Sequence, residues 1–187
     1  VVTFAIRSRT MYPRRVSGAE DMVLAAWIEK ARADQVEVAA HLRELGFTVL
    51  HNENEIFRRT GGSFLIGGVP DRAILSYGER FESNPAKALS SKEKPDYRIL
   101  LAHEPKSVFH LDGATCDLLL SGHVHGGQIF PFGLFVRLAQ PLSRGFKRIR
   151  GTLVFAHMGT GFWGPPMRWL TRSEIVRFEW VAKDRAP

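Results

Sequence analysis

The stretch Leu118-Leu119-Leu120-Ser121-Gly122-His123-Val124-His125-Gly126-Gly127-Gln128 carries the strongest structural signal in this chain of 187 residues. Its first residues form a short apolar run of the kind that builds a buried β-strand. Two histidines follow the expected strand end, one residue apart. Side chains at positions i and i+2 of an extended segment point the same way, so both imidazoles are expected to face one pocket. Imidazole is a common ligand of divalent transition metals, and the pattern therefore indicates a metal site.

A second apolar run ends in the same way earlier in the chain. Tyr97–Ala102 is expected to form a strand, and His103 follows it directly. A short amphipathic helix from Ser107 to Leu111 would connect the two strands. Such a crossover makes the strands parallel and places their carboxyl ends together. Because ligand sites in open α/β sheets gather at that edge, we expect His103, His123 and His125 to converge.

Periodicity and turn residues predict the remaining elements. A Ser-x-x-Glu capping box at Ser17 and Glu20 predicts a helix that ends at Leu45, with Gly46 as its C-terminal cap. Strands are predicted over 1–6, 47–50 and 174–181, and Val176, Phe178 and Trp180 should lie on one face of the last strand. Hairpins are predicted for 56–58 with 63–69 and for 146–150 with 152–155. A short helix is expected after Asn84-Pro85.

The segment after Gln128 is unusually apolar. Pro131 and Gly133 interrupt both the helical and the strand pattern within Ile129–Leu138, so we expect a loop. A basic cluster follows it closely, made of Arg137, Arg144, Lys147, Arg148 and Arg150. Two interpretations remain open for this loop: packing in the core, or contact with an anionic membrane surface.

Composition narrows the class of protein. Four explanations fit the net charge of +7: a nucleic-acid partner, an anionic membrane partner, a phosphorylated substrate, or simply a basic surface. No nucleic-acid-binding motif occurs, so nucleic acid is not an expected partner. Cys116 is the only cysteine, which excludes an internal disulfide and suggests a small core residue. The chain contains neither a transmembrane run nor a signal peptide, and we expect a cytoplasmic or peripheral membrane location.

Three segments together resemble the calcineurin-like metallophosphoesterases, and within them the membrane-associated bacterial branch of the YkuE type. The segments are Leu100–Pro105, Asp117–Ile129 and Gly161–Arg168. The resemblance covers roughly residues 41–181. It implies an α/β fold in which a β-sandwich of two mixed sheets is flanked by helices. We therefore divide the chain into an unmatched N-terminal segment with a helix, residues 1–40, and the C-terminal part of a metallophosphoesterase domain, residues 41–187.

The family resemblance also implies a reaction and its residues. Two divalent metals per site, Mn, Fe or Zn, hold a phosphoric ester, and a metal-bound hydroxide attacks the phosphorus. By resemblance, His103 and His123 would bind one metal and His125 the other. Residues expected to contact the phosphorylated substrate are Gly122, Gly126, Gly127 and Arg168.

Several family motifs are missing from residues 1–40. This segment contains no Asp-x-His and no Gly-Asp pair, and Gly18-Ala19-Glu20-Asp21 stands where a Gly-Asn-His motif would be expected. No catalytic acid histidine is therefore identified, and we expect the domain to lack its N-terminal portion. The main hypothesis is a metal-dependent phosphoesterase whose remaining ligands lie upstream of Val1. The alternative is a degenerate member that binds a phosphate headgroup, a membrane surface or a partner without turnover.

Overall fold

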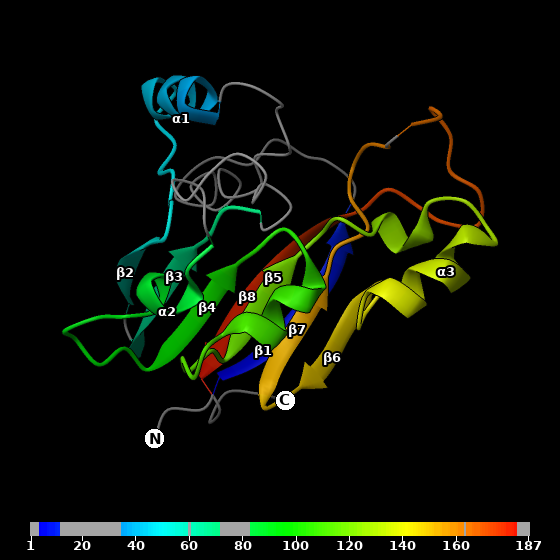
Figure 1. The fold of residues 1–187 in the computed structure, drawn as a ribbon. Coiled ribbons are helices and arrows are strands. Elements are labelled where there is room, and N and C mark those ends of the chain that lie inside the picture. The colour runs from blue at the N-terminus through cyan, green and yellow to red at the C-terminus, as the bar shows by residue number, and fades with distance from the viewer. Residues whose placement is uncertain (1–3, 12–34, 60, 72–82, 163, 183–187) are drawn as a thin grey trace.

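A six-stranded mixed sheet lies at the centre of the structure, a computed structural model that describes residues 4–11, 35–59, 61–71, 83–162 and 164–182 (Figure 1). The strand order is β2-β3-β4-β5-β7-β6. The pairings β3–β4, β4–β5 and β5–β7 are parallel, and the outer pairings β2–β3 and β6–β7 are antiparallel. The strands are β2 Glu53–Arg59, β3 Gly62–Gly68, β4 Tyr97–Leu101, β5 Leu118–Ser121, β6 Gly145–Ile149 and β7 Thr152–Ala156.

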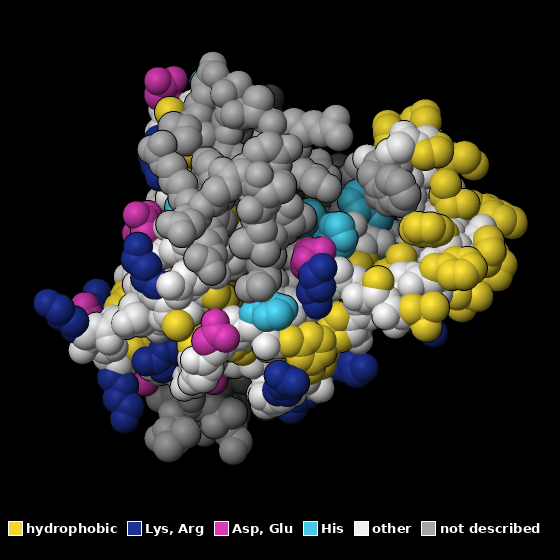
Figure 2. All heavy atoms as spheres, viewed as in Figure 1, with side chains coloured by type: hydrophobic (Ala, Val, Ile, Leu, Met, Phe, Trp, Pro, Cys, Tyr) yellow, Lys and Arg dark blue, Asp and Glu magenta, His cyan; other side chains and the backbone are white. Residues whose placement is uncertain are grey.

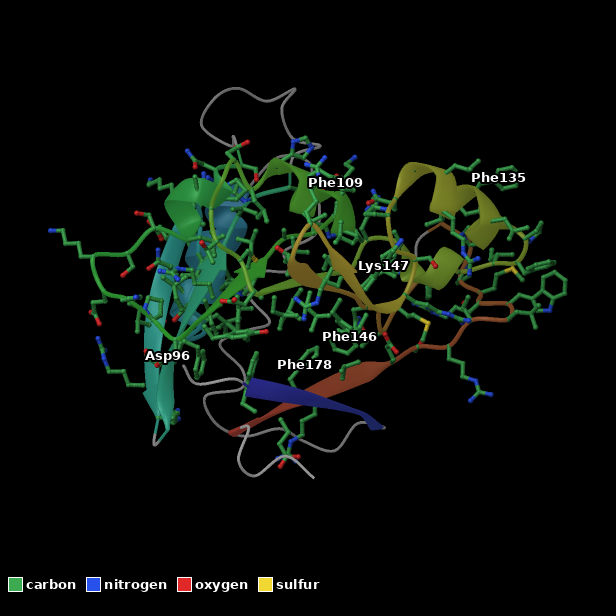
Figure 3. All side chains as sticks on the ribbon, turned by 90° about the horizontal axis from the view of Figure 1, so that it is seen from below. Asp96, Phe109, Phe135, Phe146, Lys147 and Phe178 are labelled. Carbon is green, nitrogen blue, oxygen red and sulfur yellow. The ribbon has the colours of Figure 1, made fainter. Side chains whose placement is uncertain are left out.

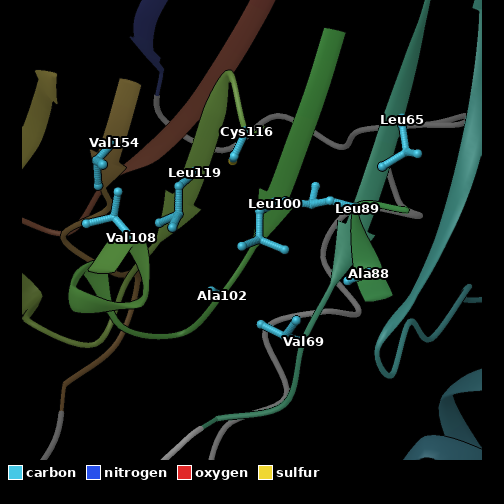
Figure 4. Close-up of a cluster of buried hydrophobic side chains, with 10 residues drawn as sticks. All are labelled: Leu65, Val69, Ala88, Leu89, Leu100, Ala102, Val108, Cys116, Leu119 and Val154. Atoms are coloured by element: carbon cyan, nitrogen blue, oxygen red, sulfur yellow. The ribbon is translucent and has the colours of Figure 1, made fainter. Parts of the chain in front are cut away.

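The apolar runs of the central strands are buried because both faces of the sheet are covered. Successive side chains alternate between the faces, so Leu100 and Leu119 point to one face while Leu101 and Leu120 point to the other. Helix α2 (Pro85–Ala88) and the 3₁₀-helix η5 (Pro105–His110) supply residues to the first face. Figure 4 shows the cluster on this face, which consists of Leu65, Val69, Ala88, Leu89, Leu100, Ala102, Val108, Cys116, Leu119 and Val154.

A two-stranded layer covers the opposite face. In this layer β1 (Phe4–Met11) pairs antiparallel with β8 (Ile175–Ala182). Phe178 of β8 points toward Phe146 of β6, with the ring centroids 6.1 Å apart (Figure 3). Val176, Phe178 and Trp180 all pack on the second core cluster, which confirms the predicted terminal strand and its apolar face.

Helix ends follow the predicted signals where the structure describes them. Helix α1 spans Gln35–Glu44, and Gly46 has a φ of +88°. The Gly46 N–H donates to the Arg43 carbonyl and the Phe47 N–H donates to the Leu42 carbonyl, which is the Schellman pattern of a glycine cap. The predicted capping box at Ser17 and Glu20 lies outside the described residues.

Phe47–Leu50 does not form the predicted strand. The segment leaves the α1 cap and runs into β2, which begins at Glu53. These residues have a high strand propensity, but the neighbouring strand β3 pairs only with residues from Glu53 onward. The predicted hairpins and the parallel pair β4–β5 are confirmed, although the crossover between β4 and β5 is a 3₁₀-helix.

The loop predicted over Ile129–Leu138 is a helix instead. Helix α3 spans Phe132–Ala139, with Pro131 immediately before its first residue. Proline is tolerated there because the first turn needs no N–H donor. The helix packs closely on the histidine turn at Gly133, because a Cβ on Gly127 would lie 2.2 Å from the Gly133 Cα atom. Pro131 thus directly precedes the helix, and Gly133 lies where the helix packs against Gly127.

The architecture agrees with the α/β expectation. A mixed six-stranded sheet with flanking helices and a second layer of strands is consistent with the calcineurin-like metallophosphoesterase fold. Among the described residues, no helix is both long enough and apolar enough to span a membrane.

Candidate metal centre

Four neighbouring strands carry ionisable side chains just beyond their carboxyl ends. Because β3, β4, β5 and β7 are mutually parallel, these ends lie along one edge of the sheet. Asp71 follows β3, His103 follows β4, His123 follows β5 and His157 follows β7. In Figure 2, histidine side chains gather on the viewed face beside the apolar region over α3. The predicted edge is therefore where the histidines lie.

His103 and His123 are in direct contact. The Leu101↔Leu120 register brings the two strand ends side by side, and the Gly122 N–H donates to the His103 carbonyl at 3.0 Å. The His103 Nε2 atom lies 3.1 Å from the His123 Nδ1 atom, and the rings are nearly perpendicular at 71°. The predicted convergence is confirmed for this pair.

Asp71 adds a carboxylate beside this pair. Its Oδ2 atom lies 3.9 Å from the His103 Nε2 atom, and its side chain is largely buried. The sequence analysis did not include Asp71 among the expected ligands. Its position just beyond β3 was the available signal, but applying the strand-end rule there requires knowing that β3 is parallel to β4.

Glu104 supports His123 from the other side of the ring. Its Oε1 atom lies 3.5 Å from the His123 Nε2 atom and accepts a hydrogen bond from the Gln140 side chain at 3.3 Å. The Oε2 atom lies 2.9 Å from Lys106 Nζ. Burial and the neighbouring His103 hold the pKa of His123 below 6.5, against the opposing effect of Glu104 and Asp71. His123 is thus held with Nε2 toward Glu104 and Nδ1 toward His103.

The donor geometry suits one divalent metal. With metal–nitrogen bonds of about 2.0–2.1 Å, two adjacent imidazole ligands have nitrogens roughly 3.0–3.4 Å apart. The separation of 3.1 Å between His103 and His123 falls in this range. A carboxylate on the second nitrogen of a ligating histidine is the common outer-shell arrangement, and Glu104 occupies that position. Among the described side chains, no set of three His, Cys, Asp or Glu is arranged to hold a metal.

His125 is oriented by a different set of contacts. The chain leaves the extended conformation after Ser121, because His123 and His125 have φ angles of +63° and +48° and η6 (His125–Gly127) forms a tight turn. The expectation that the two side chains follow an extended i, i+2 pattern is therefore wrong. His125 Nδ1 lies 3.2 Å from the Arg168 guanidinium. Its assignment as a ligand of a second metal stays a prediction.

Arg168 binds the protein itself. Its guanidinium donates to backbone carbonyls of His125, Met158, Gly159 and Gly161, with 2.8 Å for the Met158 oxygen. A further bond reaches the Arg172 carbonyl. Burial lowers the pKa of Arg168. The side chain predicted to contact substrate thus joins the 158–172 loop to the histidine turn, and its role toward substrate stays a prediction.

The three glycines of the turn have structural contacts. The Gly122 N–H donates to the His103 carbonyl and the Gly127 N–H to the Val124 carbonyl. Gly126 has a φ of +64°, and a Cβ there would lie 3.0 Å from the Met158 sulfur. Glycine is therefore needed at Gly126 and Gly127 for the turn and for close packing. The structure leaves their predicted contact with substrate open.

His157 is a further residue at this edge that the sequence interpretation missed. Its N–H donates to the Ser121 carbonyl at 2.8 Å, which places it next to the end of β5. Its Nδ1 atom accepts from the Gly159 N–H at 2.8 Å, and Glu174 accepts from the adjacent Met158 N–H at 2.7 Å. Burial holds the pKa of His157 below 6.5, with Glu174 opposing. Its position after a parallel strand was the available signal.

Comparison with known proteins identifies relatives. The chain is 36% identical over 155 residues to an uncharacterized metallophosphoesterase of Helicobacter pylori, which covers 80% of this chain and 40% of that protein. It is 47% identical over 112 residues to one from Campylobacter jejuni, covering 59% of this chain and 30% of that protein. A relative from Aquifex aeolicus is 34% identical over 137 residues, with coverages of 72% and 51%.

These matches cover only part of each relative. The chain spans between 30% and 51% of the length of these relatives. No family model matches the chain, and no solved structure matches it. Similarity to several proteins named metallophosphoesterases nevertheless supports one assignment: the chain is a sequence relative of the metallophosphoesterase family of hydrolases.

Proposed function

We propose that this chain carries part of the active site of a metal-dependent phosphoric ester hydrolase. The observation that carries the proposal is the separation of 3.1 Å between His103 Nε2 and His123 Nδ1 at the carboxyl edge of the sheet. His103 and His123 would hold one divalent metal, Mn, Fe or Zn, and the Asp71 carboxylate lies beside them, 3.9 Å from His103 Nε2. His125 would serve a second metal, by family resemblance.

The metals would supply Lewis-acid stabilisation of a phosphoryl oxygen and lower the pKa of a water molecule. The chain's own residues orient the ligands. Glu104 fixes the His123 ring by facing its Nε2 atom, so that Nδ1 faces His103. Arg168 fixes the His125 turn through the carbonyls that it binds. The substrate class proposed is a phosphodiester or a lipid- or nucleotide-linked phosphate.

A hydrolysis assay tests the reaction. We expect the protein to hydrolyse bis(p-nitrophenyl) phosphate when Mn²⁺ is added, and EDTA to abolish the hydrolysis. His103→Ala and His123→Ala should each reduce the rate strongly, whereas His41→Ala, an exposed histidine of α1, should not. A rate unaffected by both strand-end substitutions would contradict the proposal.

A second candidate function is binding of a phosphate headgroup without turnover. It is favoured by the charge of residues 118–173, which contain seven Lys and Arg residues and no Asp or Glu. Metal binding at His103 and His123 without hydrolysis of any phosphomonoester or phosphodiester, together with binding of inorganic phosphate, would support this candidate over the first.

A further inference from the structure

An exposed apolar surface lies next to the histidine turn. None of the residues of α3 is buried, and Leu138 and Phe135 are 86% and 61% exposed. Figure 2 shows hydrophobic side chains gathered at the end of the molecule where α3 lies, and Phe135 lies at the outer end in Figure 3. We define the apolar surface by six exposed residues: Phe130, Phe132, Leu134, Phe135, Leu138 and Trp169.

The apolar surface is preformed. The Phe130 N–H donates to the Trp169 carbonyl at 3.2 Å, and the Trp169 N–H donates to the Gln128 carbonyl at 3.0 Å. The Phe130 and Trp169 rings contact each other edge to face, with centroids 6.1 Å apart. The close approach of Gly127 and Gly133 fixes α3 against the turn. Exposed contiguous apolar patches of this kind mark interaction sites.

Charge identifies the chemistry of the partner. Residues 118–173, which include the whole apolar surface, contain seven Lys and Arg residues and no Asp or Glu. The rest of the chain has equal numbers of basic and acidic residues, so the net charge of +7 arises entirely from this segment. Arg137 is exposed on α3 itself, and Arg144 and Lys147 are exposed shortly after it. A partner with an apolar interior beneath an anionic surface fits both the exposed apolar side chains and the basic charge around them.

We propose that the apolar surface inserts into the interface of an anionic lipid bilayer, with the exposed Arg137, Arg144 and Lys147 contacting the headgroups. An amphipathic helix binds such an interface through its apolar side chains, and Lys and Arg add attraction to anionic lipid. Docking places the His125 turn, and with it the strand-end edge, beside the bilayer. The inference does not depend on metal binding or on hydrolysis.

Vesicle co-sedimentation tests the proposal. The protein should bind vesicles of phosphatidylcholine mixed with phosphatidylglycerol, and binding should fall as salt rises. The triple variant Leu134→Ser, Phe135→Ser, Leu138→Ser should bind about tenfold or more weakly. Leu45→Ser, which removes an exposed leucine beyond the end of α1, is the matched control and should bind normally.

A charge series separates insertion from general adhesion. Arg137→Glu should weaken binding to the anionic vesicles, whereas Arg59→Glu, which makes the same change of charge at an exposed arginine at the end of β2, should have a smaller effect. Equal binding to pure phosphatidylcholine and to the anionic mixture would overturn the electrostatic part of the proposal. Equal loss in both charge variants would overturn its location.

A fluorescent label reports insertion directly and does not require the triple variant to fold. Cys116 is the only native cysteine and is buried, so a cysteine introduced by Leu138→Cys can be labelled selectively with an environment-sensitive dye. Its emission should shift to the blue on anionic vesicles, and that of labelled Leu45→Cys should not. No shift at position 138, or vesicle-independent dimerisation that the triple variant abolishes, would show that the surface serves another purpose and would overturn the proposal.

Discussion

His103 and His123 face each other through Nε2 and Nδ1 at 3.1 Å, although 20 residues separate them in the sequence. The parallel register of β4 and β5 creates this contact, because the residues that follow paired strand ends become neighbours. Asp71 and Glu104 then supply a carboxylate on each side of the pair. The edge of the sheet therefore contains two imidazole nitrogens spaced as the ligands of one metal would be, and a carboxylate that faces one of the two rings.

Replacing Glu104 by glutamine tests the orientation of His123. Glu104→Gln removes the charge beside His123 Nε2, and loss of such an outer-shell carboxylate lowers metal affinity about 10–100-fold. Isothermal titration with Mn²⁺ measures the change. Glu93→Gln, an exposed residue that pairs with Arg58, is the matched control and should bind Mn²⁺ normally. Unchanged affinity in Glu104→Gln would mean that Glu104 does not orient a ligand.

Replacing Arg168 by lysine tests how the 158–172 loop is held. A lysine has three donors and no planar fork, so Arg168→Lys cannot retain all the bonds to the backbone carbonyls. We expect the free energy of unfolding in urea to fall by about 1–3 kcal/mol. Arg172→Lys, at an exposed position of the same loop, should change it little. Equal effects of both substitutions would argue against the proposed role.

A methyl group at Gly127 should separate α3 from the histidine turn. Its Cβ would lie 2.2 Å from the Gly133 Cα atom, and the φ of +89° disfavours any side chain. Gly127→Ala should therefore lower the free energy of unfolding by about 2 kcal/mol or more. Gly161→Ala, where nothing lies within 4 Å, provides the comparison. Tolerance of alanine at position 127 would show that α3 does not pack in this way.

The thiol of Cys116 should be inert in the folded protein. Burial, reinforced by the nearby Asp117, raises its pKa to about 12, and only 6% of the residue is exposed. Thiolate is the reactive form, so modification by a disulfide reagent at neutral pH should occur only as the protein unfolds. Following absorbance with and without urea measures this. Rapid modification in buffer alone would contradict the buried position.

Stability should decrease in acid through His157. Its folded pKa lies below 6.5, chiefly because of burial, so the unfolded state binds more protons as pH falls. The neutral imidazole contributes fully above pH 6.5, and its contribution is lost as pH falls from the unfolded pKa toward the folded one. Urea unfolding at a series of pH values should show this loss, and His157→Asn should reduce it. An identical slope in the variant would contradict the assignment.

The sequence predicted the strands well where apolar runs had turn residues at both ends. β4 and β5 were recognisable because each is a short buried run that ends in histidine, and the β2–β3 hairpin because glycines lie between two such runs. Helix α3 was not predictable in this way. Pro131 and Gly133 disrupt a helix interior but suit its first turn, and the difference depends on a contact with Gly127 that only the tertiary structure contains.

The candidate site was predictable in part for the same reason. The histidines that follow β4 and β5 could be placed by the strand-end rule. Asp71 and His157 follow strands at the same edge, but recognising them requires the strand order β3-β4-β5-β7, which local patterns do not specify. The contact between Arg168 and His125 joins residues 43 positions apart, and no spacing in the sequence indicates it.

Selective broadening of histidine signals by Mn²⁺ is the most direct test of the central claim, that His103 and His123 hold one divalent metal. The chain has seven histidines, whose imidazole signals can be resolved and assigned by substitution. We expect substoichiometric Mn²⁺ to broaden the signals of His103 and His123 together and before the others, and His123→Ala to remove the effect on His103. Broadening that begins at His41 or His110, or that leaves the His103 and His123 signals sharp at saturation, would contradict it.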